Sequence, residues 1–325
     1  MRDKYLLDFV RGIPDLFNRY DRVILLMVDA LGTQHLNLPG FDRQTLETVF
    51  PSSTPTFFYS FHSLLDPGEH GFLDWFYPVD GEVVCIPPWM TIDGKEVDVV
   101  DDEVFPFVSL SERLSDRGIS SLYLTPFPES RFTQLTGRGA SIIGIGDLSD
   151  VVGILSERSG YQFNYIYWDK IDDILHREWK SDNYHQEVKK VEDVVREISR
   201  QLDGNTLFLV TADHGQTRVD PSKSIHLPVI DGIIPYGGSR VAFYRDLDME
   251  RVREVLGDGV KLFRLTEFYD RVSERALTKY GDVVVVAPEQ HYFIYPFEQK
   301  TKKSIGMHGG LSDEERMVNL WKVEA

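Results

Sequence analysis

Short runs of apolar residues recur along the chain, and helix-like stretches lie between several of them. The runs are rich in β-branched and aromatic side chains, which is typical of buried strands. They cover residues 22–28, 119–124, 161–167, 206–211 and 282–286. Strands that alternate with helices predict an α/β fold, with a mostly parallel central sheet and helices on both of its faces.

The clearest helical pattern covers about residues 182–203. Apolar side chains recur there at steps of three or four residues, as on one face of a helix: Tyr184, Val188, Val191, Val195, Ile198 and Leu202. Residues 76–106 and 225–300 break the rhythm of strands and helices, and we interpret them as additions to a single α/β domain over residues 1–325. Residues 137–146, GRGASIIGIG, are interpreted as turns around a short strand rather than as a dinucleotide fingerprint.

Composition narrows the possible functions. The 325 residues carry a formal net charge of −17, which argues against nucleic-acid binding by a basic face. Cys85 is the single cysteine, so an intramolecular disulfide and a thiolate-cluster metal site are both excluded. A metal site in this chain therefore has to use histidine and carboxylate ligands.

The sequence gives no sign of a membrane or export segment. No apolar run reaches the roughly 18 residues that span a bilayer, and the first residues, MRDKYLLDFVRG, lack the features of a signal peptide. We therefore expect a cytoplasmic protein without a membrane partner. The oligomeric state is left open.

Candidate site residues follow three of the predicted strands. Ligands of open α/β sheets bind beyond the carboxyl ends of the strands. Asp29 follows the first run, and Asp213 and His214 follow the fourth in VTADHG. In WDKIDDILH, Asp172 and His176 are four residues apart and would share one helix face.

Each of these residues also has a purely structural interpretation. Asp213 and His214 could form a turn, Asp29 could cap a helix that starts at Leu31, and the pair in WDKIDDILH could be a solvated ion pair. In the same segment, Asp169 is a plausible helix N-cap.

Two further segments carry candidates. In VFPSSTPT, Thr54 followed by Pro55 fits a helix N-cap with proline at the first helical position. A hydroxyl at a helix N-terminus lies in positive potential, which favours an alkoxide and a bound phosphate. Ser52 and Ser53 are neighbouring candidates that this physical argument does not exclude. His308 lies in the glycine-rich GMHGGLSDEE, before a capping box formed by Ser312 and Glu315.

Taken in order, these segments resemble the alkaline phosphatase superfamily and, within it, the type I phosphodiesterase/nucleotide pyrophosphatase family. The resemblance runs from about residue 22 to residue 315. The similar pieces are VILLMVDALG, VFPSSTPT followed by DPGEHG, YWDKIDDILH, VTADHG and MHGGLS. Each piece is short, but five in the family's order make a specific signal.

The resemblance implies a metal-dependent phosphoester hydrolase with two divalent ions. One ion would be held by Asp29, Thr54, Asp213 and His214, and the other by Asp172, His176 and His308. Among the three hydroxyl residues the resemblance selects Thr54, because it precedes His70 of DPGEHG by the family's sixteen residues, and it implies a covalent phospho-threonine intermediate. His70 itself is interpreted as structural. Histidine and carboxylate ligands suit zinc, with manganese or iron as alternatives.

The substrate would be a small phosphoester or nucleotide. Many nucleotide pyrophosphatases carry asparagine three residues after the nucleophile, where this chain has Phe57, so contacts to the phosphate have to come from elsewhere. No arginine neighbours Thr54 in the sequence, which favours diesters. The open alternatives are a phosphomonoesterase, phosphomutase or phosphonate hydrolase, and a non-catalytic protein that kept the metal site. We expect the aromatic residues near position 75 mostly to pack the additions onto the sheet: Trp75, Phe76, Tyr77 and Trp89.

Overall fold

A seven-stranded sheet forms the centre of the computed structural model, which describes residues 5–34, 36–298 and 304–325. The strand order is β2-β18-β9-β1-β8-β6-β7. Five neighbouring strands are parallel: β9 (Thr206–Thr211), β1 (Arg22–Val28), β8 (Phe163–Trp168), β6 (Ser121–Thr125) and β7 (Ala140–Gly144). β18 (Met317–Glu324) runs antiparallel to β9 and pairs with the edge strand β2 (Asp42–Glu47).

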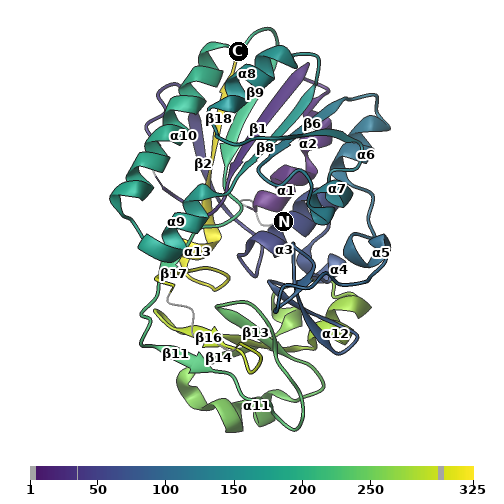
Figure 1. The fold of residues 1–325 in the computed structure, drawn as a ribbon, viewed down its shortest axis with the longest axis vertical. Coiled ribbons are helices and arrows are strands. Elements are labelled where there is room, and N and C mark those ends of the chain that lie inside the picture. The colour runs from purple at the N-terminus through teal and green to yellow at the C-terminus, as the bar shows by residue number, and fades with distance from the viewer. Residues whose placement is uncertain (1–4, 35, 299–303) are drawn as a thin grey trace.

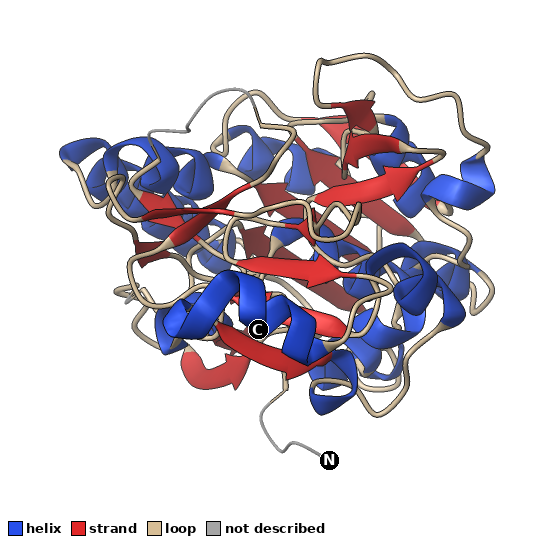
Figure 2. Ribbon diagram, turned by 90° about the horizontal axis from the view of Figure 1, so that it is seen from below, coloured by secondary structure: helices blue, strands red, loops and turns tan. Residues whose placement is uncertain are grey.

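Helices cover both faces of this sheet. In Figure 1, α9 and α10 lie on the left of the sheet and α6 and α7 on the right, and Figure 2 shows helices on both sides of the strands. The helices that flank it are α3 (Thr54–Ser63), α6 (Leu110–Ser115), α7 (Arg131–Thr136), α8 (Asp150–Glu157), α9 (Lys170–Glu178) and α10 (Asp182–Arg200). Because both faces are covered, the inner strands are mostly apolar, and every residue of β8 and β9 is buried.

The remaining helices are short and have between four and eight residues each. They are α1 (Leu6–Arg11), α2 (Ile13–Leu16), α4 (Pro67–His70), α5 (Asp101–Val104), α11 (Met249–Leu256), α12 (Glu274–Tyr280) and α13 (Asp313–Arg316). Within the described residues, no helix is both long enough and apolar enough to span a bilayer.

The second sheet is built from the two regions that break the sequence rhythm. Its strand order is β14-β15-β13-β12-β3-β4-β5 and its pairings are antiparallel. One region supplies β3 (Phe76–Val79), β4 (Glu82–Cys85) and β5 (Met90–Thr91), and the other supplies β12 (Tyr236–Gly237), β13 (Val241–Tyr244), β14 (Lys261–Arg264) and β15 (Val283–Val286). The regions join where Gly237 pairs with Phe76.

The structure confirms four of the five predicted core strands and the helix, which runs from Asp182 to Arg200. The fifth predicted strand forms, but its predicted place in the central sheet is wrong. Residues 283–286 form β15, which pairs antiparallel with β13 and β14 in the second sheet. The parallel edge strand of the central sheet is β7, within the segment interpreted as turns around a short strand.

Two small two-stranded sheets complete the fold. β10 (Thr217–Arg218) pairs with β17 (Gly306–Met307), and β11 (Ser224–His226) pairs with β16 (Tyr292–Ile294). The first pairing brings the chain near residue 308 close to the end of β9. It therefore places the C-terminal glycine-rich loop beside residues that follow the central strands.

Candidate active site

Three adjacent strands deliver most of the candidate residues to one edge of the central sheet. β1 lies between β8 and β9, with Val28 opposite Trp168 and Met27 opposite Thr211. The segments after these strands therefore start side by side. They carry Asp29, the pair Asp172 and His176 on α9, and the pair Asp213 and His214.

The first cluster contains Asp29, Asp213 and His214, all of them buried. One ligand atom of each residue lies within 4.8 Å of the others. His214 Nε2 is 3.5 Å from Asp29 Oδ1 and 3.4 Å from Asp213 Oδ2. No helix starts at Leu31, so Asp29 is not the N-cap that its position also allowed.

The second cluster contains Asp172, His176 and His308, again with ligand atoms within 4.8 Å of one another. His176 Nε2 is 3.2 Å from Asp172 Oδ2, which confirms that the two residues share a face of α9. His308 Nε2 is 3.7 Å from Asp172 Oδ1. The rings of His308 and His214 stack with centroids 4.0 Å apart, so the two clusters are in contact.

All three imidazoles direct the same nitrogen into the site. Their Nδ1 atoms face backbone carbonyl oxygens: Gly306 O for His176, Gly215 O for His214 and Ser52 O for His308. A carbonyl oxygen can only accept, so each Nδ1 carries the proton and each Nε2 carries the lone pair that can bind a metal ion. This tautomer, fixed by a backbone contact, is the usual arrangement of a metal-ligating histidine.

Of the three candidate hydroxyl residues Ser52, Ser53 and Thr54, Thr54 is the one that reaches the clusters. Its Oγ1 lies 3.0 Å from His214 Nε2 and 3.3 Å from Asp29 Oδ2. Ser52 Oγ instead donates to Gly310 O, and Ser53 Oγ is paired with Thr56 Oγ1 at 2.9 Å. Within the described residues, neither serine hydroxyl makes a hydrogen bond with a cluster residue.

The prediction that Thr54 caps α3 is wrong. Ser53 is the N-cap residue, with extended backbone angles, and α3 begins at Thr54 with Pro55 as its second residue. The Thr54 hydroxyl is therefore not used for capping and is free to contact the clusters. Asp169 does occupy the N-cap position of α9, but its side chain makes no capping hydrogen bond.

Burial makes the charges of the first cluster unfavourable in the metal-free chain. Burial and the neighbouring Asp213 raise the pKa of Asp29 well above its usual value. Burial also raises the pKa of Asp213 to about 7 and lowers that of His214 to about 4. Two buried carboxylates beside neutral imidazoles would be stabilised by a cation.

The donor atoms fit divalent metal ions. Asp29 Oδ1 and Asp213 Oδ2 are buried and have no hydrogen-bond partner within the described residues. Each cluster combines carboxylate oxygens with neutral imidazole nitrogens, a donor set that suits zinc, manganese or iron better than magnesium or calcium. Burial lowers the pKa of His308 to about 3, so this imidazole also stays in the neutral form that binds metal.

The structure adds supporting residues that the sequence did not reveal. The Tyr167 hydroxyl donates to Asp29 Oδ2, and Gln216 Nε2 donates to Asp172 Oδ1. Tyr167 lies in β8 and Gln216 in the loop between His214 and β10, so neither has a motif of its own. The sequence signal that could have identified Tyr167 and Gln216 is their position near the ends of strands.

Two cavities meet at Thr54. One, of about 380 Å³, is lined by Thr54, Asp172, His176 and His308 together with Trp75 and Arg177. The other, of about 400 Å³, also includes Thr54 and Asp172 but is mainly aromatic. Trp75 lines both, whereas Tyr77 and Trp89 are buried and pack the second sheet, as expected for most of these aromatic residues. Phe57 is fully buried against Phe61 and does not face the site.

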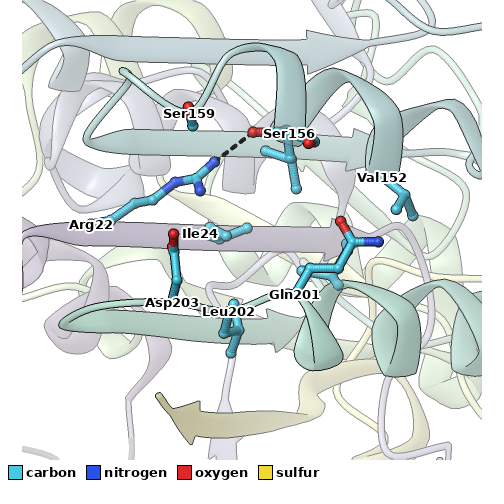
Figure 3. A pocket seen from close by; sticks show the side chains of 10 residues that line it. Arg22, Ile24, Val152, Ser156, Ser159, Gln201, Leu202 and Asp203 are labelled. Atoms are coloured by element: carbon cyan, nitrogen blue, oxygen red, sulfur yellow. Dashed lines mark hydrogen bonds between the residues drawn. The ribbon is translucent and has the colours of Figure 1, made fainter.

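A separate cavity of about 230 Å³ lies at the opposite end of β1 (Figure 3). Its Arg22 donates to Leu155 O at 3.0 Å, and Ser156, Gln201 and Asp203 also line it. The two metal-ligand clusters found within the described residues both lie elsewhere, at the carboxyl ends of the strands. The candidate active site therefore lies at the edge of the central sheet near Thr54 and not at this cavity.

Solved structures with the same fold share the architecture over nearly the whole chain. Murine ectonucleotide pyrophosphatase/phosphodiesterase 5, an inactive variant in complex with AMP, has a TM-score of 0.70 at 16% identity and covers 93% of this chain and 87% of its own. Phosphonoacetate hydrolase from Sinorhizobium meliloti, in complex with phosphonoformate, matches with a TM-score of 0.68 at 15% identity. The match covers 94% of this chain and 90% of the hydrolase. The chain has the predicted alkaline phosphatase-like α/β fold.

A sequence model of the type I phosphodiesterase/nucleotide pyrophosphatase family matches residues 126–311, which is more than half of the chain. The chain belongs to this family, and its class is that of a phosphoester hydrolase. No curated protein sequence matches the chain. Asp29 and Thr54 precede the matched segment, so their place in the site rests on geometry.

Proposed function

We propose that this protein hydrolyses phosphodiesters of small molecules, with Thr54 as the nucleophile and two divalent metal ions as cofactors. The observation that carries the proposal is the contact of Thr54 Oγ1 with both Asp29 and His214, at 3.3 and 3.0 Å. Asp29, Thr54, Asp213 and His214 would hold one ion, and Asp172, His176 and His308 the other. The ions would supply positive charge that favours the alkoxide of Thr54 and stabilises the leaving oxygen.

The residues of the chain determine how the nucleophile is presented. The N-terminus of α3 directs positive potential at Thr54 Oγ1, which favours loss of its proton and the approach of an anionic phosphoryl group. The acceptors in contact with the hydroxyl are Asp29 Oδ2 and His214 Nε2. Tyr167, which donates to Asp29 Oδ2, keeps this carboxylate in place.

The reaction has two displacements at phosphorus. In the first, a bond forms between Thr54 Oγ1 and phosphorus, and the bond from phosphorus to the leaving alcohol breaks. In the second, a water oxygen attacks phosphorus, and the bond to Thr54 breaks and restores the hydroxyl. The three aspartates carry −3 and two divalent ions would carry +4. The site would then attract an anion although the whole chain carries −17.

Replacement of Thr54 tests the proposal. Thr54→Ala should abolish hydrolysis of bis(p-nitrophenyl) phosphate while the bound metal stays near two ions per chain, and Thr54→Ser should retain activity. Ser53→Ala is the matched control, because its hydroxyl is paired with Thr56 rather than with the clusters. Mass spectrometry of an acid-quenched reaction should find the phosphoryl adduct on the peptide that contains Thr54. Undiminished turnover by Thr54→Ala would remove Thr54 from this role.

A monoesterase or phosphonate hydrolase is the second candidate, and one observation favours it. Arg177 lines the same cavity as Thr54, although no arginine is near Thr54 in the sequence. Its guanidinium is paired with Asp173 and largely exposed, so the diester proposal stands first. Rates on p-nitrophenyl phosphate, bis(p-nitrophenyl) phosphate and phosphonoacetate rank the candidates. A preference of several orders of magnitude for the monoester or phosphonate would reverse the ranking.

A further inference from the structure

Every carboxylate of the two clusters has one oxygen that accepts hydrogen bonds from the protein. In the first cluster, Asp29 Oδ2 accepts from the Tyr167 hydroxyl. Asp213 Oδ1 accepts from the backbone N–H groups of Ala30 and His214, at 3.1 and 2.9 Å. The other two oxygens, Asp29 Oδ1 and Asp213 Oδ2, are buried and have no hydrogen-bond partner within the described residues. Each of these carboxylates therefore presents a single oxygen to a cation.

In the second cluster, the side chain of Gln216 supplies this hydrogen bond to Asp172. Gln216 Nε2 donates to Asp172 Oδ1, and it also donates to the backbone oxygen of Asp172 at 3.3 Å. Both hydrogens of the amide therefore hold the same residue, one by its side chain and one by its backbone. The reverse orientation of the amide would place its oxygen against two acceptors, so the contact itself decides which end of the amide faces Asp172.

The amide of Gln216 is held in this position from its other end. Gln216 is 7% exposed, and its Oε1 is buried. A Cβ atom built on Gly306 would lie 2.4 Å from this oxygen, so the amide packs directly against the backbone of β17. Gly306 O in turn accepts from His176 Nδ1. Gln216 therefore connects Asp172 with the strand that orients His176, the other ligand on α9.

The oxygen of Asp172 that Gln216 does not contact is the one that can share an ion with His176. Asp172 Oδ2 is 3.2 Å from His176 Nε2, whereas Asp172 Oδ1 is 3.7 Å from His308 Nε2. Two ligand atoms on one tetrahedral zinc ion are about 3.3 Å apart, because each bond is about 2.0–2.1 Å long. Oδ2 and the two imidazole nitrogens would then be three protein ligands, and a fourth position would stay open for water or substrate.

We infer that Gln216 is a positioning residue that makes Asp172 a one-oxygen ligand, and that it thereby sets the preference of the second site for a four-coordinate ion. The inference rests on the two metal ions of the proposed function. A carboxylate with both oxygens available can supply two ligand atoms, which suits ions that take five or six ligands, such as manganese. The hydrogen bond from Gln216 removes this option, so the second site favours zinc over manganese.

Gln216→Leu tests the inference, because leucine fills a similar volume but has no group that donates a hydrogen bond or binds metal. Metal-free protein is titrated with zinc, and separately with manganese, in chelator-buffered solutions. The zinc affinity of the second site should fall about 10–100-fold and its manganese affinity should fall less, so the ratio of the two affinities should shift toward manganese about tenfold. The first site should keep its zinc affinity. Gln201→Leu is the matched control, because its exposed amide binds Glu197, and it should change neither site.

Cobalt provides a spectroscopic measurement of the same site. Four-coordinate Co²⁺ absorbs visible light much more strongly than six-coordinate Co²⁺, so its spectrum reports the number of ligands. The difference between the spectra of the natural sequence and of His308→Ala isolates the second site, because His308 belongs to that cluster alone. This difference should be intense in the natural sequence and clearly weaker when Gln216→Leu is the background.

Three results would overturn the inference. They are an unchanged cobalt spectrum in Gln216→Leu, equal losses of zinc and manganese affinity, and loss of zinc from both sites, which would show that the effect is not confined to Asp172. If Thr54→Ala abolishes diester hydrolysis but Gln216→Leu keeps the natural metal preference, only this inference fails. If the chain binds no divalent metal, the proposed function fails with it.

Discussion

Arg240 and Glu315 form a buried ion pair between the region of the second sheet and α13, the helix that follows the loop with His308. Arg240 Nε lies 3.1 Å from Glu315 Oε1, and the two side chains are 3% and 0% exposed. Glu315 Oε1 also accepts from Gly310 N at 2.8 Å, two residues after His308. Arg240 directly precedes β13. The pair therefore ties a candidate metal ligand to a part of the chain far from it in sequence.

Replacing only one residue of this ion pair should lower the free energy of unfolding. Arg240→Met would leave a buried, unpaired carboxylate, and we expect a loss of about 3–5 kcal/mol in the free energy of unfolding. Arg240→Met combined with Glu315→Leu should cost clearly less than the sum of the single changes. Urea denaturation of the metal-free proteins measures both. Arg251→Met is the matched control, because Arg251 binds Asp231 with two hydrogen bonds at an exposed site and its loss should matter little. Equal losses in the free energy of unfolding for Arg240→Met and Arg251→Met would show that the buried ion pair stabilises the fold no more than the exposed one.

The two clusters should lose metal separately. His308→Ala removes a ligand from the second cluster but none from the first, so one ion should be lost and one retained. Metal analysis after dialysis measures the content, with His226→Ala on the exposed part of β11 as the control. Loss of neither ion would place His308 outside the site. Loss of both would show that the stacked His214 and His308 rings bind as one unit.

The sequence predicted those parts of the fold whose signal is local. The buried strands β1 and β9 have the predicted bounds, because strands covered on both faces form nearly continuous apolar runs. Asp172 and His176 could be paired because helix geometry alone brings positions four residues apart together. The resemblance to the family then supplied Thr54 and His308, which lie on segments with no regular spacing to the strands.

What the sequence could not predict depends on pairing between distant segments. The second sheet joins Phe76 to Gly237, and β2 lies beside β18, although about 270 residues separate these strands. Ser53 and Thr54 are both suitable N-caps, and only the extended backbone of Ser53 decides which of them caps α3. Glu315 was assigned to a capping box, which the structure confirms, but its partner Arg240 is 75 residues away.

His62 should make the protein less stable in acid. Its imidazole is buried among aromatic rings, its Nε2 has no described partner, and burial lowers its pKa to about 3. The unfolded chain takes up this proton near pH 6.5 and the folded chain does not, so stability is lost as the pH falls from about 6.5 toward 3. At pH 5 the loss relative to neutral pH should be about 2 kcal/mol.

His62→Phe tests this contribution because it keeps a ring in the aromatic surroundings and removes the titrating group. The variant should gain stability relative to the natural sequence as the pH falls from 7 to 5, when both are unfolded in urea without metal. The comparison is made between proteins because buried carboxylates such as Asp74, whose pKa burial raises to about 7, act in the opposite direction. His185→Phe, at an exposed position on α10, should show no such gain. A parallel pH dependence of His62→Phe and the natural sequence would contradict the assignment.

Gly215 should tolerate no side chain. It follows His214, and a Cβ atom built on it would lie 2.2 Å from Glu314 O, a backbone atom that cannot move without displacing α13. Gly215 N also donates to Glu315 O at 2.8 Å, and Gly215 O accepts from His214 Nδ1. Gly215→Ala should therefore destabilise the fold by about 1–3 kcal/mol and weaken metal binding at the first cluster, because it disturbs the contact that orients His214.

The same change from glycine to alanine at Gly153 should stabilise the protein rather than destabilise it. Gly153 lies inside α8, and a Cβ atom built on it would meet no atom within 4 Å. Alanine there removes the helix cost of glycine and should stabilise the protein by about 0.5–1 kcal/mol. Urea denaturation of both variants, with metal analysis of Gly215→Ala, separates the effect of the close contact from that of the residue type. A neutral Gly215→Ala with full metal content would mean that α13 moves aside at little cost, and that the backbone beside His214 does not need this close approach to hold the imidazole.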